Sequence, residues 1–408
     1  MAERIDNANF YGDEYEFTSR GGGGGTGGGG MGITGGAYVP AEGGITTTNR
    51  WLRFDFDNPS HKALKILAGT TFSMGDTIIP FDEDTSINLS DYISEPGADY
   101  YVFVNADKRV VCSTLRTQPD GYMFIGQFHT LCIDCNENMT GLNPVDAGNV
   151  FSVGDTITLQ NYFKERDLDF YNFYTKEIRA MNPDSSTYSL ATVDHPLSGF
   201  KACDILPESV WCLNWHPVSK IWDGMVWCNS ANICVDIYLQ SGNGFSTRSE
   251  YGAVHTVSRA WLNQENDYLL IGKSLLSVSE FMQIATGSNE LTGIYGGDQS
   301  VVGGHSDTSG RRMISFIGCE ECCGYINQRT CHIAELSERN TWTIDDGRGL
   351  MGRSSDTISS ILIGGPWDGA TPYGGANYPG SRSISGRPNW FELNPIEGGR
   401  GCCNVTIV

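Results

Sequence analysis

The chain has 408 residues, including 51 glycines, with 39% hydrophobic residues and a formal net charge of −21. This length exceeds one ordinary hydrophobic core, and the composition is typical of a globular, turn-rich protein. The negative charge opposes binding to nucleic acid or to anionic lipid. The sequence contains neither a long apolar run nor a signal peptide, so we expect no membrane insertion and synthesis in a cytoplasm.

The N-terminal part divides into two segments before the first strand pattern. Residues 1–20 are polar with several aromatic side chains, and we expect them to be an anchoring peptide. Residues 21–48 include the run GGGGGTGGGGMGITGG, whose backbone entropy predicts a flexible linker.

Residues 49–135 are expected to form short strands joined by turns, because short alternating apolar runs are bounded by turn residues. Asn105-Ala106-Asp107 separates two such runs and predicts a hairpin. Residues 68–78 recur at 147–157 with eight of eleven positions identical, which predicts turns at Gly75-Asp76 and Gly154-Asp155. We interpret residues 136–204 as an inserted β-rich subdomain.

Residues 205–408 combine strands, helices and glycine-rich loops. Ser277 and Glu280 form a capping box that predicts a helix with apolar positions to residue 285. Residues 252–264 are a weaker helix candidate, and residues 235–239 are typical of a strand. The whole chain is therefore predicted to be α+β and mostly β.

The segment 361–403 carries the most specific pattern in the chain. Gly364-Gly365-x-Trp367 and Gly398-Gly399-Arg400-Gly401 flank residues rich in Gly, Pro, Asn and Tyr, without helical or strand periodicity. Such a long loop on a rigid scaffold is typical of a binding site. The pattern favours recognition over catalysis.

Sequence motifs of catalysis are absent from the chain. It contains no HExxH, GxSxG or complete dinucleotide motif, and residues 267–274 lack the first glycine of a phosphate-binding loop. We therefore predict that the protein is not an enzyme and needs no cofactor.

The thirteen cysteines leave a structural metal as an alternative. A cluster has spacing suited to thiolate ligation of zinc, and comprises Cys319, Cys322, Cys323, Cys331 and the adjoining His332. Buried thiols, or disulfides formed in an oxidising medium, explain it equally. The acidic turns at Asp82-Glu83-Asp84 and Asp345-Asp346 could contact calcium, although solvated turns account for them as well.

The C-terminal motifs resemble the C-type-lectin-fold domain of the major tropism determinant family, which are receptor-binding proteins of bacteriophage tail fibres. The matching residues, which we call the frame motifs, are Gly364-Gly365-Pro366-Trp367, Gly380-Ser381-Arg382 and Gly398-Gly399-Arg400-Gly401-Cys402-Cys403. The resemblance covers most of residues 60–135 and 205–408. It implies a β-sandwich domain at residues 49–135 and a C-type-lectin-like receptor-binding domain at residues 205–408.

The resemblance implies a homotrimer in the virion, at the tail tip or tail fibre, synthesised in the host cytoplasm. Other phage tail proteins would bind its N-terminus, and its C-terminal loops would bind a host surface receptor, either protein or glycan. Arg400 would hold several loop carbonyls with its five donors. The implied receptor-binding residues are Pro366, Asp368, Gly369, Ala370, Tyr373, Tyr378, Ser385, Arg387, Pro388, Asn389, Trp390, Glu392, Asn394, Ile396 and Glu397.

Two departures and two alternatives accompany this interpretation. About six extra residues lengthen the first loop, and Glu392 and Glu397 cannot arise from the family's diversified asparagine codons by adenine changes, which favours a fixed binder. A structural virion decoration protein is one alternative. A formylglycine-generating oxidase, whose cysteine pair holds copper, is the other, but the adjacent Cys402 and Cys403 should point apart.

Overall fold

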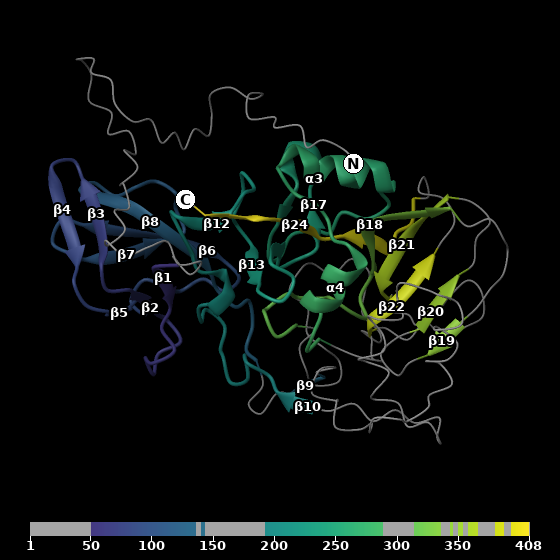
Figure 1. Cartoon of the computed structure of the whole chain (residues 1–408), viewed down its shortest axis with the longest axis horizontal. Coiled ribbons are helices and arrows are strands. Elements are labelled where there is room, and N and C mark those ends of the chain that lie inside the picture. The colour runs from purple at the N-terminus through teal and green to yellow at the C-terminus, as the bar shows by residue number, and fades with distance from the viewer. Residues whose placement is uncertain are drawn as a thin grey trace, which may run out of the picture.

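The computed structural model describes residues 50–135, 140–142, 192–288, 314–335, 343–345, 350–353, 358–365, 380–386 and 393–407. The protein is mostly β, as predicted. In Figure 1 the N-terminal strands lie at one end of the molecule, a second group of strands lies at the other, and two helices lie between them. Within the described residues, neither helix is long and apolar enough to cross a membrane.

The N-terminal strands form small sheets that pack around one core. Two sheets have the orders β1-β2-β5 and β3-β4. The predicted hairpin at residues 105–109 is confirmed, because the Asn105 side chain accepts from the backbone N–H groups of Asp107 and Arg109. The strands are β1 (Leu52–Phe54), β2 (Ala63–Ile66), β3 (Thr70–Met74), β4 (Thr77–Phe81), β5 (Thr85–Asn88), β6 (Asp99–Asn105), β7 (Val110–Ser113) and β8 (Tyr122–His129).

The predicted turn at Gly75-Asp76 joins β3 to β4 and is confirmed. The second copy of this element, residues 147–157, lies outside the described residues, as do the predicted anchoring peptide and linker. Of the predicted inserted subdomain, the structure describes the pair β9 (Thr140–Leu142) and β10 (Thr192–Asp194), together with residues 195–204.

One six-stranded sheet crosses the boundary that was predicted between residues 204 and 205. Its order is β25-β12-β11-β8-β6-β7, with β11 (Trp211–Cys212), β12 (Trp215–Pro217) and β25 (Val405–Ile407). Figure 1 shows the C-terminus returning to this sheet beside β12. The sandwich sheet is therefore completed by strands from the C-terminal part of the chain.

The C-terminal part contains two further sheets, with the orders β13-β14-β24-β17 and β19-β20-β22-β21-β18-β23, and a short pair β15-β16. The strands are β13 (Met225–Cys228), β14 (Ile233–Asp236), β15 (Gln240–Ser241), β16 (Arg248–Ser249), β17 (Ser274–Leu275), β18 (Asn327–Glu335), β19 (Thr343–Asp345), β20 (Leu350–Arg353), β21 (Ile358–Gly364), β22 (Gly380–Gly386), β23 (Glu397–Gly399) and β24 (Gly401–Cys403). The helices are α3 (Trp261–Leu270), α4 (Val278–Ile284) and the short 3-10 helices η3 (Pro207–Ser209) and η4 (Gly244–Ser246).

The structure confirms one predicted helix and shows that the other begins later in the sequence than predicted. Helix α4 begins after Ser277, whose hydroxyl accepts from the Glu280 N–H while the Glu280 side chain accepts from the Ser277 N–H. The prediction for residues 252–264 is wrong in position, because Ser258 has a φ of +54° and the helix begins only at Trp261. The predicted strand at 235–239 is displaced too, and ends at Asp236.

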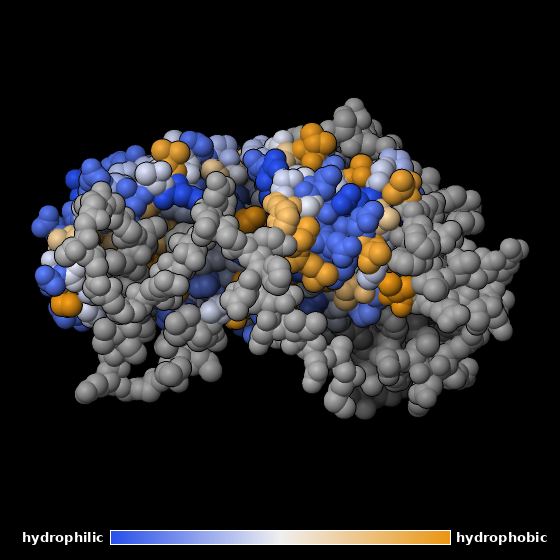
Figure 2. All heavy atoms as spheres, turned by 90° about the horizontal axis from the view of Figure 1, so that it is seen from above, coloured by the Kyte–Doolittle hydropathy of each residue, from blue (hydrophilic) through white to orange (hydrophobic). Residues whose placement is uncertain are grey.

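The largest hydrophobic cluster of the described residues runs through both halves of the molecule. Tryptophans join the halves: Trp211 stacks on Trp215 with ring centroids 5.0 Å apart, and Trp215 meets Trp227 edge-on at 5.2 Å. On the described part of the face in Figure 2, exposed apolar residues form small separate groups among hydrophilic ones. The apolar surface is thus mainly inside, between the two halves and under α4.

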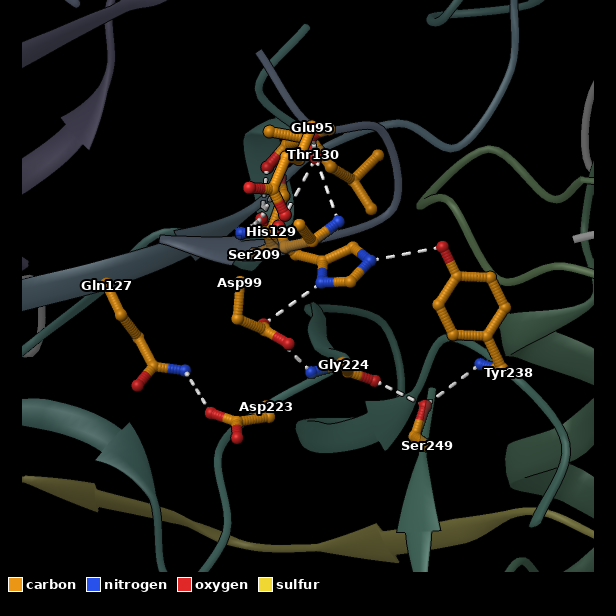
Figure 3. A network of polar contacts seen from close by, with 12 residues as sticks. Glu95, Asp99, Gln127, His129, Thr130, Ser209, Asp223, Gly224, Tyr238 and Ser249 are labelled. Atoms are coloured by element: carbon orange, nitrogen blue, oxygen red, sulfur yellow. Dashed lines mark hydrogen bonds and ion pairs between the residues drawn. The ribbon is translucent and has the colours of Figure 1, made fainter. Parts of the chain in front are cut away.

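A buried polar network joins the sandwich to the C-terminal part (Figure 3). At the end of β8, His129 Nδ1 lies 3.0 Å from Asp99 Oδ1 and its Nε2 lies 3.1 Å from the Tyr238 hydroxyl. Asp99 also accepts from the Gly224 N–H, and Ser249 Oγ donates to the Gly224 carbonyl. With His129 only 2% exposed, this network holds the junction together inside the fold.

Asp223 extends this junction toward β6 and β8. Its carboxylate accepts from the Tyr101 hydroxyl at 2.9 Å and from Gln127 Nε2 at 3.5 Å, and forms an ion pair with Arg116. Burial, and next the neighbouring Asp99 carboxylate, raise the pKa of Asp223 above its ordinary 3.8, against the opposing effect of Arg116. The junction therefore contains a carboxyl group that resists ionisation.

We predict that Gly126→Ala destabilises the protein. A Cβ at Gly126 on β8 would lie 2.3 Å from the Trp211 carbonyl oxygen and 2.7 Å from Leu52 Cδ2. Overpacking of this kind costs about 1–3 kcal/mol, to be measured by denaturant unfolding. Gly121→Ala is the control, since its Cβ meets nothing within 4 Å and only its φ of +75° is unfavourable, a cost of about 1 kcal/mol. Equal losses for both variants would contradict the close approach of β8 to β11.

We also predict that Asp223 makes stability depend on pH. A raised folded-state pKa means that the folded protein binds this proton more tightly than the unfolded chain. The contribution of Asp223 is therefore present at low pH and is lost as the pH rises through the folded pKa. The free energy of unfolding of the wild type, relative to Asp223→Asn, should fall as the pH is raised from about 4, the ordinary pKa of an unfolded Asp, toward neutral pH. Asp107→Asn, at an exposed turn, controls for the loss of one charge, and a difference that stays constant over this range contradicts the assignment.

Candidate functional site

The frame motifs place two connections at the same end of one sheet. Strand β21 is antiparallel to both β18 and β22, while β18 and β23 are parallel. Residues 365–379 join the end of β21 to the start of β22, and residues 393–396 enter the start of β23. Two strand spacings separate β21 from β23, on the order of 10 Å. The two connections therefore converge on one end of the sheet that Figure 1 shows at the far side from the sandwich.

Eight of the fifteen predicted receptor-binding residues belong to these connections by sequence, whereas the five from Arg387 to Glu392 follow Gly386, the end of β22 away from Gly380. Ser385 lies in β22, opposite Leu362, at the other end of that strand from Gly380. Asn394 and Ile396 are half-buried on the approach to β23. The remainder, apart from Glu397, lie outside the described residues: Pro366, Asp368, Gly369, Ala370, Tyr373, Tyr378, Arg387, Pro388, Asn389, Trp390 and Glu392.

Glu397 differs from the expectation, because its side chain is buried and does not belong to an exposed face. It is 3% exposed, and the Arg329 guanidinium donates to its Oε2 at 2.6 Å. Asn394 Nδ2 donates to its Oε1 at 3.2 Å. A buried carboxylate held by an equally buried arginine has a structural role, since removing either partner leaves an uncompensated charge.

Asn394 shapes the turn before this ion pair. Its side-chain Oδ1 accepts from the Ile396 N–H at 3.1 Å, and its carbonyl accepts from the Glu397 N–H at 3.2 Å. The same carbonyl accepts from the Ser258 N–H, which anchors the turn to the segment before α3. Asn394 therefore fixes the path on which the second connection enters the sheet.

Arg400 is the centre of the frame and confirms the role expected for it. Its guanidinium is 1% exposed and donates to the carbonyls of Asp236, at 2.7 Å, Ile237 and Glu320. Its Nε also donates to Gln328 Oε1 at 3.2 Å. One side chain thus joins the end of β14, the loop at residue 320 and β18.

The glycines of the frame motifs are required by close contacts. Gly364 has a φ of +91°, and a Cβ there would lie 2.6 Å from the Cys322 carbonyl oxygen. A Cβ at Gly398 would lie 2.5 Å from Ile326 Cδ1, and one at Gly401 would lie 2.6 Å from Asp236 Oδ2. A side chain at Gly364 would therefore require a backbone shift, whereas side chains at Gly398 and Gly401 would require the neighbouring buried side chains to move.

A buried ion pair supports the same strands. Lys273 Nζ lies 2.6 Å from Asp236 Oδ1, and the Gly401 N–H donates to Asp236 Oδ2 at 3.1 Å. Burial raises the pKa of Asp236, while the charges of Lys273 and Arg400 oppose that shift. The pair ties β14, β17 and β24 together beneath the frame.

The four cysteines proposed as a metal site do not come together as one group. Cys319, Cys322 and Cys323 are buried in the main core, whereas Cys331 on β18 packs beside Tyr268 in a separate cluster. His332 Nδ1 instead accepts from the N–H of the first residue of α4. Among the residues that the structure describes, no three His, Cys, Asp or Glu side chains are arranged to hold a metal ion.

Cys402 and Cys403 point to opposite sides of β24, as expected for neighbours on a strand. The Cys402 thiol lies 3.6 Å from Ser274 Oγ on β17, while the Cys403 thiol contacts Cys234 on β14. The two sulfur atoms therefore have different neighbours and do not form the paired copper ligands of the oxidase alternative.

Comparisons with known proteins identify the fold. No protein-family model matches the sequence, and a search of curated proteins gives no match. Among solved structures, the Major Tropism Determinant U1 Variant is similar with a TM-score of 0.62 and 17% identity, over 91% of this chain and 86% of that one. The I1 Variant has a TM-score of 0.62 and 18% identity, over 91% of this chain and 87% of that one. The chain therefore has a fold like that of the major tropism determinant.

We predict that Arg400→Lys destabilises the protein strongly. A lysine ammonium cannot reach acceptors on three different segments, so buried carbonyls would lose their donors. The expected loss is about 3 kcal/mol or more in the free energy of unfolding, measured with denaturant. Arg248→Lys, in an exposed ion pair, is the matched control and should change stability by less than about 0.5 kcal/mol. A tolerated Arg400→Lys would show that the frame does not depend on this side chain.

Proposed function

We propose that this chain is a phage receptor-binding protein that recognises a receptor on the host cell surface through its C-terminal connections. The observation that carries the proposal is the fold likeness, which spans 91% of the chain. The names of the similar structures state a role in tropism. We infer the same role here, with virion localisation at the tail.

The frame suits this role physically. Arg400, the Asp236–Lys273 pair and the crowded glycines hold the strands rigidly, and the two connections begin and end on those strands. Connections held on rigid elements lose little conformational entropy on binding and are where binding residues concentrate. Tyr373 and Tyr378, in the lengthened first connection, are the proposed aromatic contacts, and Arg387 and Asn389 the polar ones.

Burial of Glu397 narrows the proposed contact set. A glutamate that holds Arg329 inside the fold has a reason to be fixed that is independent of any receptor. The observation supports a receptor binder whose frame is constant and whose contacts lie before residue 397. We further propose a homotrimer, in which weak individual contacts are multiplied by avidity, and attachment to other tail proteins by the N-terminus.

A structural virion protein without a receptor is the second candidate. It would share the rigid frame but would not need Tyr373 and Tyr378 of the first connection as receptor contacts. The two candidates differ in adsorption: a receptor binder, purified alone, binds susceptible cells and blocks infection, whereas a decoration protein does neither.

We predict that Tyr378→Ala and Arg387→Ala each weaken binding of the purified protein to cells of the host strain. Loss of a central contact side chain should reduce affinity about tenfold, measured by binding of labelled protein. Leu115→Ala is the control, because Leu115 is exposed on the sandwich, away from the frame. Thermal unfolding should be unchanged in all three variants. If both contact variants bind like the wild type, the receptor does not use these two residues.

A further inference from the structure

Two cysteines from distant parts of the sequence face each other within one sheet. Strands β14 and β24 are antiparallel, and Cys234 is directly opposite Cys403 in their register. Directly opposed residues in such a pair have Cα atoms about 4.5–5.5 Å apart, which lies inside the range of about 4.4–6.8 Å that a disulfide spans. The two thiols already interact with each other through a hydrogen bond. Little movement of the backbone is needed to bond them.

We propose that Cys234 and Cys403 form an intramolecular disulfide when the protein meets an oxidising medium. The bond would fasten β24 to β14 beside the Arg400 cluster. The loop that it closes, residues 234–403, contains the whole frame and every predicted receptor-binding residue. The modification would therefore stabilise the scaffold of the binding loops in an oxidising medium.

Cys403 is the thiol that reacts first. It is 8% exposed whereas Cys234 is fully buried, so a soluble oxidant reaches Cys403 more easily. The hydrogen bond from Cys234 lowers the pKa of Cys403, and the charge of Lys273 acts in the same direction against burial. Burial raises the pKa of Cys234, which remains a thiol until its partner has reacted. Thiolates are the nucleophiles in disulfide exchange, so this difference sets the order of the steps.

A small disulfide such as oxidised glutathione supplies the oxidising equivalents. The Cys403 thiolate attacks one sulfur atom of glutathione disulfide, forming a mixed disulfide and releasing one glutathione thiolate. Cys234 then loses its proton and attacks Cys403 Sγ, which breaks the mixed disulfide and releases the second glutathione thiolate. Two protein thiols are oxidised to one disulfide, one glutathione disulfide is reduced to two thiols, and the two protons pass to the released glutathione.

The other neighbouring cysteines are less suited to this reaction. Cys319 and Cys322 interact with each other, but both are fully buried and inaccessible to a soluble oxidant. Cys402 is next to Cys403 in the sequence, yet its thiol lies on the other side of β24, toward Ser274. The geometry therefore selects one partner for Cys403.

The test uses the full-length protein, purified reduced and then incubated with oxidised glutathione in native buffer. After remaining thiols are alkylated, intact mass should show the loss of two hydrogens, and a non-reducing peptide map should join Cys234 to Cys403. The thermal midpoint should rise by about 5–10 °C and fall again when the bond is reduced. Absence of the cross-link in the folded wild type, or a cross-link between Cys319 and Cys322 instead, overturns the proposal without requiring any variant.

Two serine variants sharpen this experiment. Cys403→Ser should abolish both the cross-link and the redox-dependent shift of the thermal midpoint. Cys402→Ser, the neighbour on the other side of the strand, should retain both. Loss of the cross-link in Cys402→Ser, or its persistence in Cys403→Ser, would show that Cys403 is not the reactive thiol. None of these outcomes depends on what the protein binds.

Discussion

The C-terminal half depends on one constraint, the hydrogen bonding of all three guanidinium nitrogens of the buried Arg400. A buried charge is tolerated only where its donors find acceptors, and here the acceptors come from three separate segments. Arg400 can donate to Asp236, Glu320 and Gln328 together only when their three segments hold one relative arrangement. The small residues around it, Gly398 to Gly401, let the strands approach closely enough for that arrangement.

Local signals in the sequence predicted local structure well. The capping box of Ser277 and the turn at Asn105 depend on neighbours within a few residues, and both occur as expected. The role of Arg400 was predictable too, because its five donors in a glycine-rich motif need several acceptors. By contrast, β14 ends at Asp236 because the next carbonyl, that of Ile237, accepts hydrogen bonds from the Arg400 guanidinium and the Glu320 N–H. No pattern near residue 237 contains that information.

Tertiary partners decided the features that the sequence did not reveal. Glu397 is buried because it pairs with Arg329, which lies 68 residues earlier in the sequence. The start of α3 follows from the left-handed backbone at Ser258, whose N–H bonds to Asn394. The shared sheet of β8, β11, β12 and β25 joins residues that lie far apart in the chain. The candidate binding residues came from a family resemblance, and the frame that surrounds them follows from the structure.

The position of β25 also determines when the protein can finish folding. Because β25 forms the outer strand beside β12, the sandwich sheet stays incomplete until residues 405–407 have left the ribosome. During synthesis β12 is an open edge with unpaired backbone groups, and such edges invite association between nascent chains. The sandwich sheet is thus completed only after β25, which lies far later in the sequence than the other strands of that sheet, has been translated.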